Sequence, residues 1–227
     1  MRKLINIHSL LWAMPLMIFP LVGFGEFNHV QWDQLLKDNV VSIRGGQVTK
    51  VDYDGFIRSR EDLRNYLAGL SRVDRTQFNS WSKSDQLAFL INSYNAWTIE
   101  VVLTRYPELE SIRDIGLFPF SVWRKNIVKL FGDKLSLDDI EHKMIRGSGL
   151  YEDPRIHFAL NCAAIGCPAL RPEAYVGTYL DRQLEEATAL FLTDKSRNYF
   201  LDGELYISSI FDWYKEDFEK GWLGINS

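Results

Sequence analysis

The two cysteines of the chain, Cys162 and Cys167, lie in one short segment that also carries His157 and Asn161. The residues just before that segment, 156–160, are mostly apolar, and such a short run predicts a buried strand. Small residues, a glycine and a proline then interrupt the run, which indicates a loop. Polar and reactive groups in a loop at the end of a buried strand are typical of a functional site.

The chemistry that these residue types suggest is that of a thiol nucleophile. A free thiol has a pKa of about 8.5, and a neighbouring imidazolium lowers it so that the reactive thiolate forms. We expect Cys162 to be the nucleophile and His142 its base, with the imidazole oriented by Asn92, Asn95 or Glu141. The natural reaction is acyl transfer, meaning peptide or isopeptide hydrolysis or transamidation.

The two asparagines have a second interpretation. Residues 87–106 are apolar on nearly every face, which predicts a buried helix that ends before Pro107. Asn92 and Asn95 fall on one face of this helix, and a buried amide must be hydrogen-bonded or it destabilises the fold. They are therefore expected to point inward and bind the backbone of a neighbouring loop, with or without a catalytic role.

The thiol hypothesis has alternatives as well. Cys162 and Cys167 could form a disulfide, which would remove the nucleophile, or Cys162 could be a buried apolar thiol. The protein would then be a non-catalytic binding or scaffolding domain. A deep polar pocket at Cys162 would favour an enzyme, whereas a flat aromatic patch around Trp213 and Trp222 would favour binding.

The remaining elements are short helices and hairpins without a regular β-α alternation. Helices are expected at residues 27–37 and after the Ser/Thr-x-x-Asp sequences that begin at Ser59, Ser82, Ser136, Thr178 and Ser209. Hairpins are expected at 40–53, turning at Gly45-Gly46, and at 123–134, and a last strand at 205–207. The predicted fold class is α+β, with a central buried helix and further helices packed on short antiparallel strands.

The first 25 residues have the pattern of a signal peptide. Arg2 and Lys3 precede an apolar run, Leu10–Phe24, and small residues at Gly23 and Gly25 suit a cleavage site. The run is shorter than the roughly 20 residues that span a bilayer, although an uncleaved anchor stays the alternative. We therefore expect a periplasmic or secreted protein that has no membrane attachment after cleavage.

Residues 26–227 are expected to form a single domain. Removing residues 1–25 takes away two cations and no anions, so the formal charge changes from -4 to -6. This mildly acidic balance gives no reason to expect nucleic acid as a partner. The two cysteines and the scattered histidines have no metal-binding spacing, so neither a metal nor a cofactor is expected. The expected partner is a small-molecule or peptide substrate.

The order of five motifs resembles domain-of-unknown-function family 547. The motifs are 87–99, 111–116, 135–142, 153–168 and 210–214, and the resemblance extends over about residues 40–218. It implies an exported bacterial member of a family without an established activity. It also implies that a disulfide is not a family requirement, because similar plant proteins carry Ser at the position of Cys167, and it singles out Cys162. Those plant relatives resemble parts of larger coiled-coil proteins, which implies an interaction module.

Overall fold

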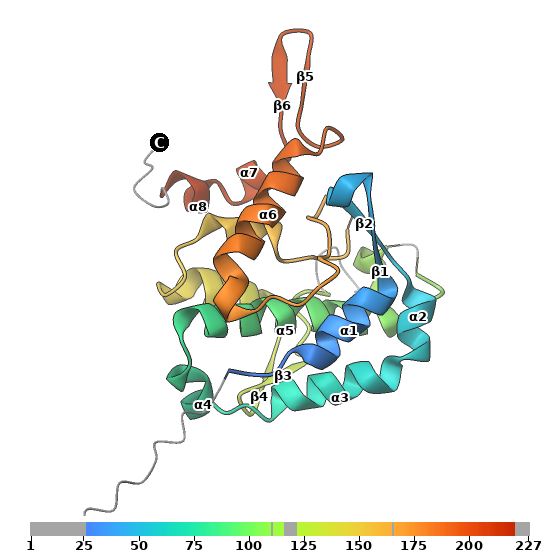
Figure 1. Cartoon of the computed structure of the whole chain (residues 1–227), viewed down its shortest axis with the longest axis vertical. Coiled ribbons are helices and arrows are strands. Elements are labelled where there is room, and N and C mark those ends of the chain that lie inside the picture. The colour runs from blue at the N-terminus through green and yellow to red at the C-terminus, as the bar shows by residue number, and fades with distance from the viewer. Residues whose placement is uncertain (1–25, 110, 116–121, 165, 221–227) are drawn as a thin grey trace, which may run out of the picture.

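The longest helix, α5 (Lys83–Leu103), passes through the middle of the body (Figure 1). The computed structural model describes residues 26–109, 111–115, 122–164 and 166–220. Almost every side chain of α5 from Gln86 onward is buried, polar ones included, so the prediction of a buried central helix is confirmed. It contacts α2, α3 and the segment that carries Glu141.

The other helices surround α5 and are short. They are α1 (Val30–Asn39), α2 (Tyr53–Arg58), α3 (Arg60–Ser71), α4 (Arg75–Ser80), α6 (Leu180–Thr193), α7 (Ile210–Trp213) and α8 (Lys215–Glu219). A π-helix, Asp139–Ile145, carries Glu141 and His142. None of the helices described here is long and apolar enough to cross a membrane. The expected signal peptide, residues 1–25, lies outside the described residues.

Two of the five expected helix caps form. Ser82 Oγ accepts the backbone N–H of Asp85 at 3.1 Å, and Ser136 Oγ accepts that of Asp139 at 3.0 Å. The caps expected from Ser59, Thr178 and Ser209 are wrong, although a helix follows each. Ser59 ends α2, which the sequence pattern did not predict, and its hydroxyl donates backward to the carbonyl of Gly55.

Within the residues that the structure describes, the strands form three antiparallel hairpins, which confirms the α+β class. They are β1 (Val40–Ile43) with β2 (Val48–Val51), β3 (Val128–Leu130) with β4 (Asp133–Leu135), and β5 (Tyr199–Leu201) with β6 (Glu204–Tyr206). The first turns at Gly45 and Gly46, whose φ angles of 68° and 95° favour glycine. The last strand was expected, but its partner β5 was not.

The predicted strand at 156–160 is wrong, because the residues Pro154–Phe158 form a 3-10 helix. The carboxylate of Asp153 accepts the backbone N–H of Arg155 at 3.0 Å, and Pro154 supplies a fixed φ at the first helical position. The backbone N–H of Leu160 then donates to the carbonyl of Ile156 at 3.1 Å. The Asp-Pro pair is a helix-start signal that outweighs the short apolar run.

Candidate functional site

A cavity of about 470 Å³ brings together three of the expected site residues, Glu141, His142 and Cys162. The π-helix supplies the first two, and the cysteine loop supplies the third. Aromatic side chains complete much of the wall, with Tyr94 from α5 and Tyr214 from between α7 and α8. The other lining residues are Arg113, Trp123, Arg124, Asp138, Arg146, Ala164, Gly166, Cys167 and Trp213.

Glu141 is held by aromatic hydroxyl groups. It is 6% exposed, and Tyr214 Oη donates to its Oε1 at 2.6 Å. Burial raises the pKa of Tyr214 strongly, and the carboxylate of Glu141 adds to the effect. The pKa of Tyr94 is raised in the same way, by burial first and then by Glu141. Both phenols therefore stay protonated as donors, and Tyr214 fixes the Glu141 carboxylate.

His142 is exposed at the cavity and contacts Arg146, one helical turn further on. The Nη1 of Arg146 lies 2.9 Å from Nδ1 of His142. A guanidinium only donates hydrogen bonds, so Nδ1 is the acceptor and the proton of the neutral ring lies on Nε2. In this tautomer Nε2 is the ring atom that can donate a hydrogen bond. To accept a thiol proton at Nε2, the ring would have to exchange tautomer and release Arg146.

A partly buried ion pair lies next to the residues that line the cavity. Arg146 Nε donates to Oδ2 of Asp217 at 2.5 Å, and Nε2 of His157 lies 2.8 Å from the same oxygen. Burial acts to raise the pKa of Asp217, but the bonds from Arg146 and His157 outweigh it and lower the value to about 2. The carboxylate is therefore ionised at neutral pH and accepts both bonds.

His157 joins this ion pair to the wall of the cavity. Burial lowers its pKa to about 4, against the opposing effect of Asp217, so the ring is neutral at pH 7 and donates from Nε2. One face of the imidazole ring stacks on the ring of Tyr214, with ring centroids 3.7 Å apart. The position of Tyr214, and through it that of Glu141, thus depends on a neutral His157.

Cys162 and Cys167 form a disulfide, one of the alternatives that the sequence left open. The loop is also closed by Asn161, whose Nδ2 donates to the carbonyl of Pro168 at 2.7 Å and whose Oδ1 accepts the N–H of Ala163. Arg197 donates to the carbonyl of Cys167. In this form neither cysteine has a thiol, and the loop is a wall of the cavity.

Asn92 and Asn95 are not among the lining residues of this cavity, and each binds backbone through both ends of its amide. Asn92 donates to the carbonyl of Tyr175 at 2.7 Å and accepts its N–H at 3.0 Å. Asn95 donates to the carbonyl of Ala159 at 3.0 Å and accepts the N–H of Asn161 at 2.8 Å. These contacts confirm the expected inward orientation and the bonds to loop backbone.

The contacts around Glu141 had no signal in the sequence. Tyr214 and Asp217 lie some 60 to 73 positions away from Glu141 and His157 along the chain. The sequence predicted a helix after Ser209 but not the partners of the side chains that follow it. Trp213, at the rim of the cavity, is 59% exposed, and Trp222 lies outside the described residues. Within the described ranges, no group of three or more His, Cys, Asp or Glu residues could hold a metal ion.

The comparison with protein families covers this part of the molecule. A family model described as "Protein of unknown function, DUF547" matches residues 78–192, a shorter stretch than the expected resemblance. The matched stretch includes α5, the β3–β4 hairpin, the π-helix, the cysteine loop and all of α6 except Thr193. No curated protein and no solved structure matches the chain. The chain belongs to the DUF547 family of proteins of unknown function.

Proposed function

We propose that this protein binds a peptide or a peptide-like small molecule in the cavity at Glu141, His142 and the Cys162–Cys167 loop. The observation that carries the proposal is the cavity itself, whose 470 Å³ lie within the range of small-molecule sites. Its wall combines indole and phenol rings with hydrogen-bond donors and acceptors. Peptide groups need both kinds of polar partner, and apolar side chains pack on the rings.

The polar groups of the cavity are fixed before a ligand arrives. Tyr214 holds Glu141, and Arg146 sets the tautomer in which His142 donates from Nε2. Asp138 pairs with Arg124 at 3.3 Å on the same wall. Such preorganisation favours binding because little side-chain freedom is lost when the ligand enters.

A pool of N-acetylated tripeptide amides tests this function. Saturation-transfer NMR on the oxidised protein is expected to show transfer to a subset of the pool. Trp213→Ala should reduce that transfer at least fivefold, because the exposed indole forms the rim of the cavity. Tyr206→Ala, on the exposed β5–β6 hairpin, is the control and should leave the transfer unchanged. Transfer that Trp213→Ala leaves unchanged, or no transfer at all, would contradict the proposal.

Thiol-dependent acyl transfer is the second candidate, favoured by the fact that Cys162 and His142 line one cavity. A dithiol would first reduce the disulfide, giving two electrons and two protons to Cys162 and Cys167 and becoming a disulfide itself. The Cys162 sulfur would then bond to the acyl carbon, the bond to the leaving group would break, and His142 would pass the thiol proton to that group. Water would hydrolyse the thioester.

An acyl donor separates the two candidates. With p-nitrophenyl acetate, the reduced protein is expected to release a burst of nitrophenolate if acyl transfer occurs. Cys162→Ser should abolish the burst, His142→Ala should slow it, and Cys167→Ser should keep it. No burst from the reduced Cys167→Ser variant would eliminate acyl transfer and leave binding as the function.

Export from the cytoplasm completes the proposal. A disulfide persists in an oxidising compartment, and the cysteine pair fits a periplasmic or secreted protein. Cleavage is expected after Gly25, so that the product begins at Glu26. Mass spectrometry of the exported fraction checks this, and a product that keeps Met1 would contradict it.

A further inference from the structure

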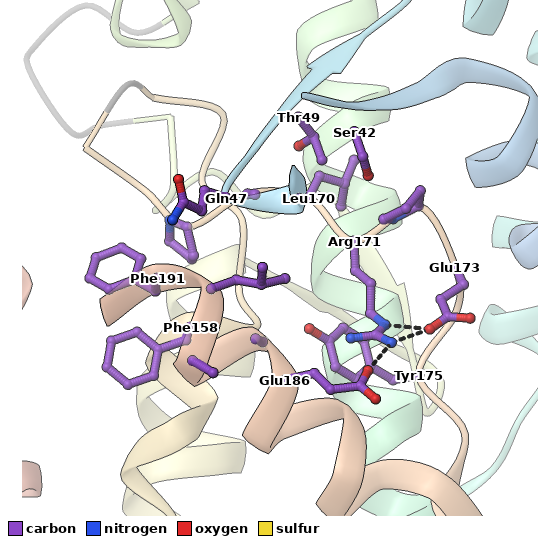
Figure 2. Close-up of a pocket in the computed structure, with 17 residues that line it drawn as sticks. Ser42, Gln47, Thr49, Phe158, Leu170, Arg171, Glu173, Tyr175, Glu186 and Phe191 are labelled. Carbon is purple, nitrogen blue, oxygen red and sulfur yellow. Dashed lines mark hydrogen bonds and ion pairs between the residues drawn. The ribbon is translucent and has the colours of Figure 1, made fainter. Parts of the chain in front are cut away.

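A second cavity, of about 410 Å³, lies between the β1–β2 hairpin, the segment 168–173 and α6 (Figure 2). Its described lining shares no residue with the cavity at Glu141. The hairpin turn comes close to α6 here, since a side chain at Gly46 would meet the methyl groups of Leu190 at 3.4 Å. Residues of the turn and of α6 thus both line the cavity.

One end of this cavity is apolar. Phe158 and Phe191 lie together there, with ring centroids 4.8 Å apart. Leu170, Leu190 and alanines of α6 extend the apolar wall. Such a surface gains free energy by covering a hydrocarbon chain, at roughly 25 cal/mol for each Å² removed from water.

The other end carries a charged cluster, centred on Arg171 in Figure 2. Its guanidinium donates to Glu173 and, at 2.5 Å, to Glu186, and its Nη1 lies 3.4 Å from the carbonyl of Gln183. One largely buried cation thus faces two carboxylates, and a further cation, Arg182, is 66% exposed and lies 3.6 Å from Glu186. A carboxylate head would meet two negative charges and a guanidinium already engaged.

Tyr175 offers an unused donor at this end. Its side chain is only 2% exposed and lines the cavity beside Arg171. The backbone of Tyr175 is held by Asn92, whereas its hydroxyl makes no hydrogen bond to the part of the chain that the structure describes. Burial raises the pKa of this phenol, so the hydroxyl keeps its proton. The hydroxyl keeps some accessible surface, so a ligand in the cavity can accept a hydrogen bond from it.

We propose that this cavity binds an uncharged amphiphile, with its hydrocarbon chain against Phe158 and Phe191 and a hydroxyl or amide head at Tyr175 and Glu186. The head accepts from the hydroxyl of Tyr175 and donates to the carboxylate of Glu186. A group that both donates and accepts satisfies the two partners at once, whereas a carboxylate can satisfy only Tyr175. This site is separate from the proposed peptide site and does not depend on it.

Two probes with the same chain and different heads test the proposal. 1-Decanol and decanoate are titrated, below their aggregation limits, into the purified protein and followed by NMR shifts of the α6 amides. Decanol is expected to bind saturably, and decanoate at least tenfold more weakly. No saturable binding of decanol, or equal binding of decanoate, would overturn the proposal.

Three variants locate the binding. Leu190→Trp fills the cavity from a partly exposed position of α6 and should abolish saturable binding. Tyr175→Phe keeps the backbone bonds to Asn92 and should weaken decanol at least threefold. Trp213→Ala, at the other cavity, should leave the affinity unchanged, and circular dichroism checks that each variant is folded. Decanol affinity unaffected by Leu190→Trp would refute the assigned position of the hydrocarbon chain. Decanol affinity unaffected by Tyr175→Phe would refute the assigned position of the head group.

Discussion

The side-chain carbonyl of Asn95 accepts a hydrogen bond of 2.8 Å from the backbone N–H of Asn161, the residue that precedes Cys162. Its amide nitrogen donates at 3.0 Å to the carbonyl of Ala159, two residues earlier. One buried residue of α5 thus fixes the course of the chain where it leaves the 3-10 helix and enters the cysteine loop. The buried helix α5 therefore positions the cysteine loop, which forms one wall of the cavity.

Replacing Asn95 with Leu tests this anchor. The size of the side chain is kept, but a backbone N–H and a carbonyl lose their partner. An unpaired buried group costs about 1–3 kcal/mol, and we expect a loss of about 2–4 kcal/mol in the free energy of unfolding. Urea denaturation measures it. Asn79→Leu, at an exposed position of α4, is the control and should change stability by less than about 0.5 kcal/mol.

Tyr214→Phe removes only the hydroxyl that donates to the buried Glu141. We expect a loss of about 1–3 kcal/mol, because the carboxylate keeps its burial and loses a bond of 2.6 Å. The chain offers a matched control in Tyr206→Phe, whose hydroxyl donates to Glu204 at an exposed site. If urea denaturation gave the same small change for both variants, Tyr214 would not hold Glu141.

The His157–Asp217 pair predicts how stability depends on pH. The pKa of His157 falls from 6.5 in the unfolded chain to about 4 in the fold, because burial disfavours the charged ring. The unfolded chain therefore binds the proton first as the pH falls. The stability due to neutral His157 is complete above about pH 6.5 and is lost between pH 6.5 and 4.

Asp217 contributes in a lower window. Its pKa of about 2 lies below the ordinary value of 3.8, so its contribution is complete above that value and is lost as the pH falls from 3.8 to 2. Urea denaturation of the protein and of His157→Gln, from pH 7.5 to 4.5, separates the contribution of His157 from that of Asp217. In that range the free energy of unfolding of the variant should depend less steeply on pH, by up to about 1.4 kcal/mol per pH unit. Buried His29 contributes the same pH dependence to both proteins. If the free energies of unfolding of the two proteins changed equally with pH, the assignment to His157 would be contradicted.

Much of the fold could be predicted from local patterns. The all-round apolar run predicted α5, its two amides predicted the bonds to loop backbone, and the Ser136 cap placed Glu141 and His142 together on a short helix. Two hairpins followed from their glycine turns. These features depend on neighbours in sequence, which is why periodicity and spacing suffice to find them.

The rest depends on contacts between distant segments. The bonds of Tyr214 to Glu141 and of Asp217 to His157 join parts of the chain that no local pattern relates. Whether Cys162 and Cys167 form a disulfide also had to stay open, since their spacing alone does not decide it. The false strand at 156–160 arose because a mostly apolar run of five residues suits a buried helix turn equally well.

The central claim is that the cavity at Glu141, His142 and the cysteine loop holds a ligand, and chemical modification of His142 tests it most directly. Diethyl pyrocarbonate should modify exposed His142 in the oxidised protein faster than buried His157, with the products mapped by mass spectrometry. The account predicts that the tripeptide pool slows the modification of His142 at least threefold and leaves that of a remote exposed lysine, Lys134, unchanged. Equal rates for His142 with and without the pool would contradict it.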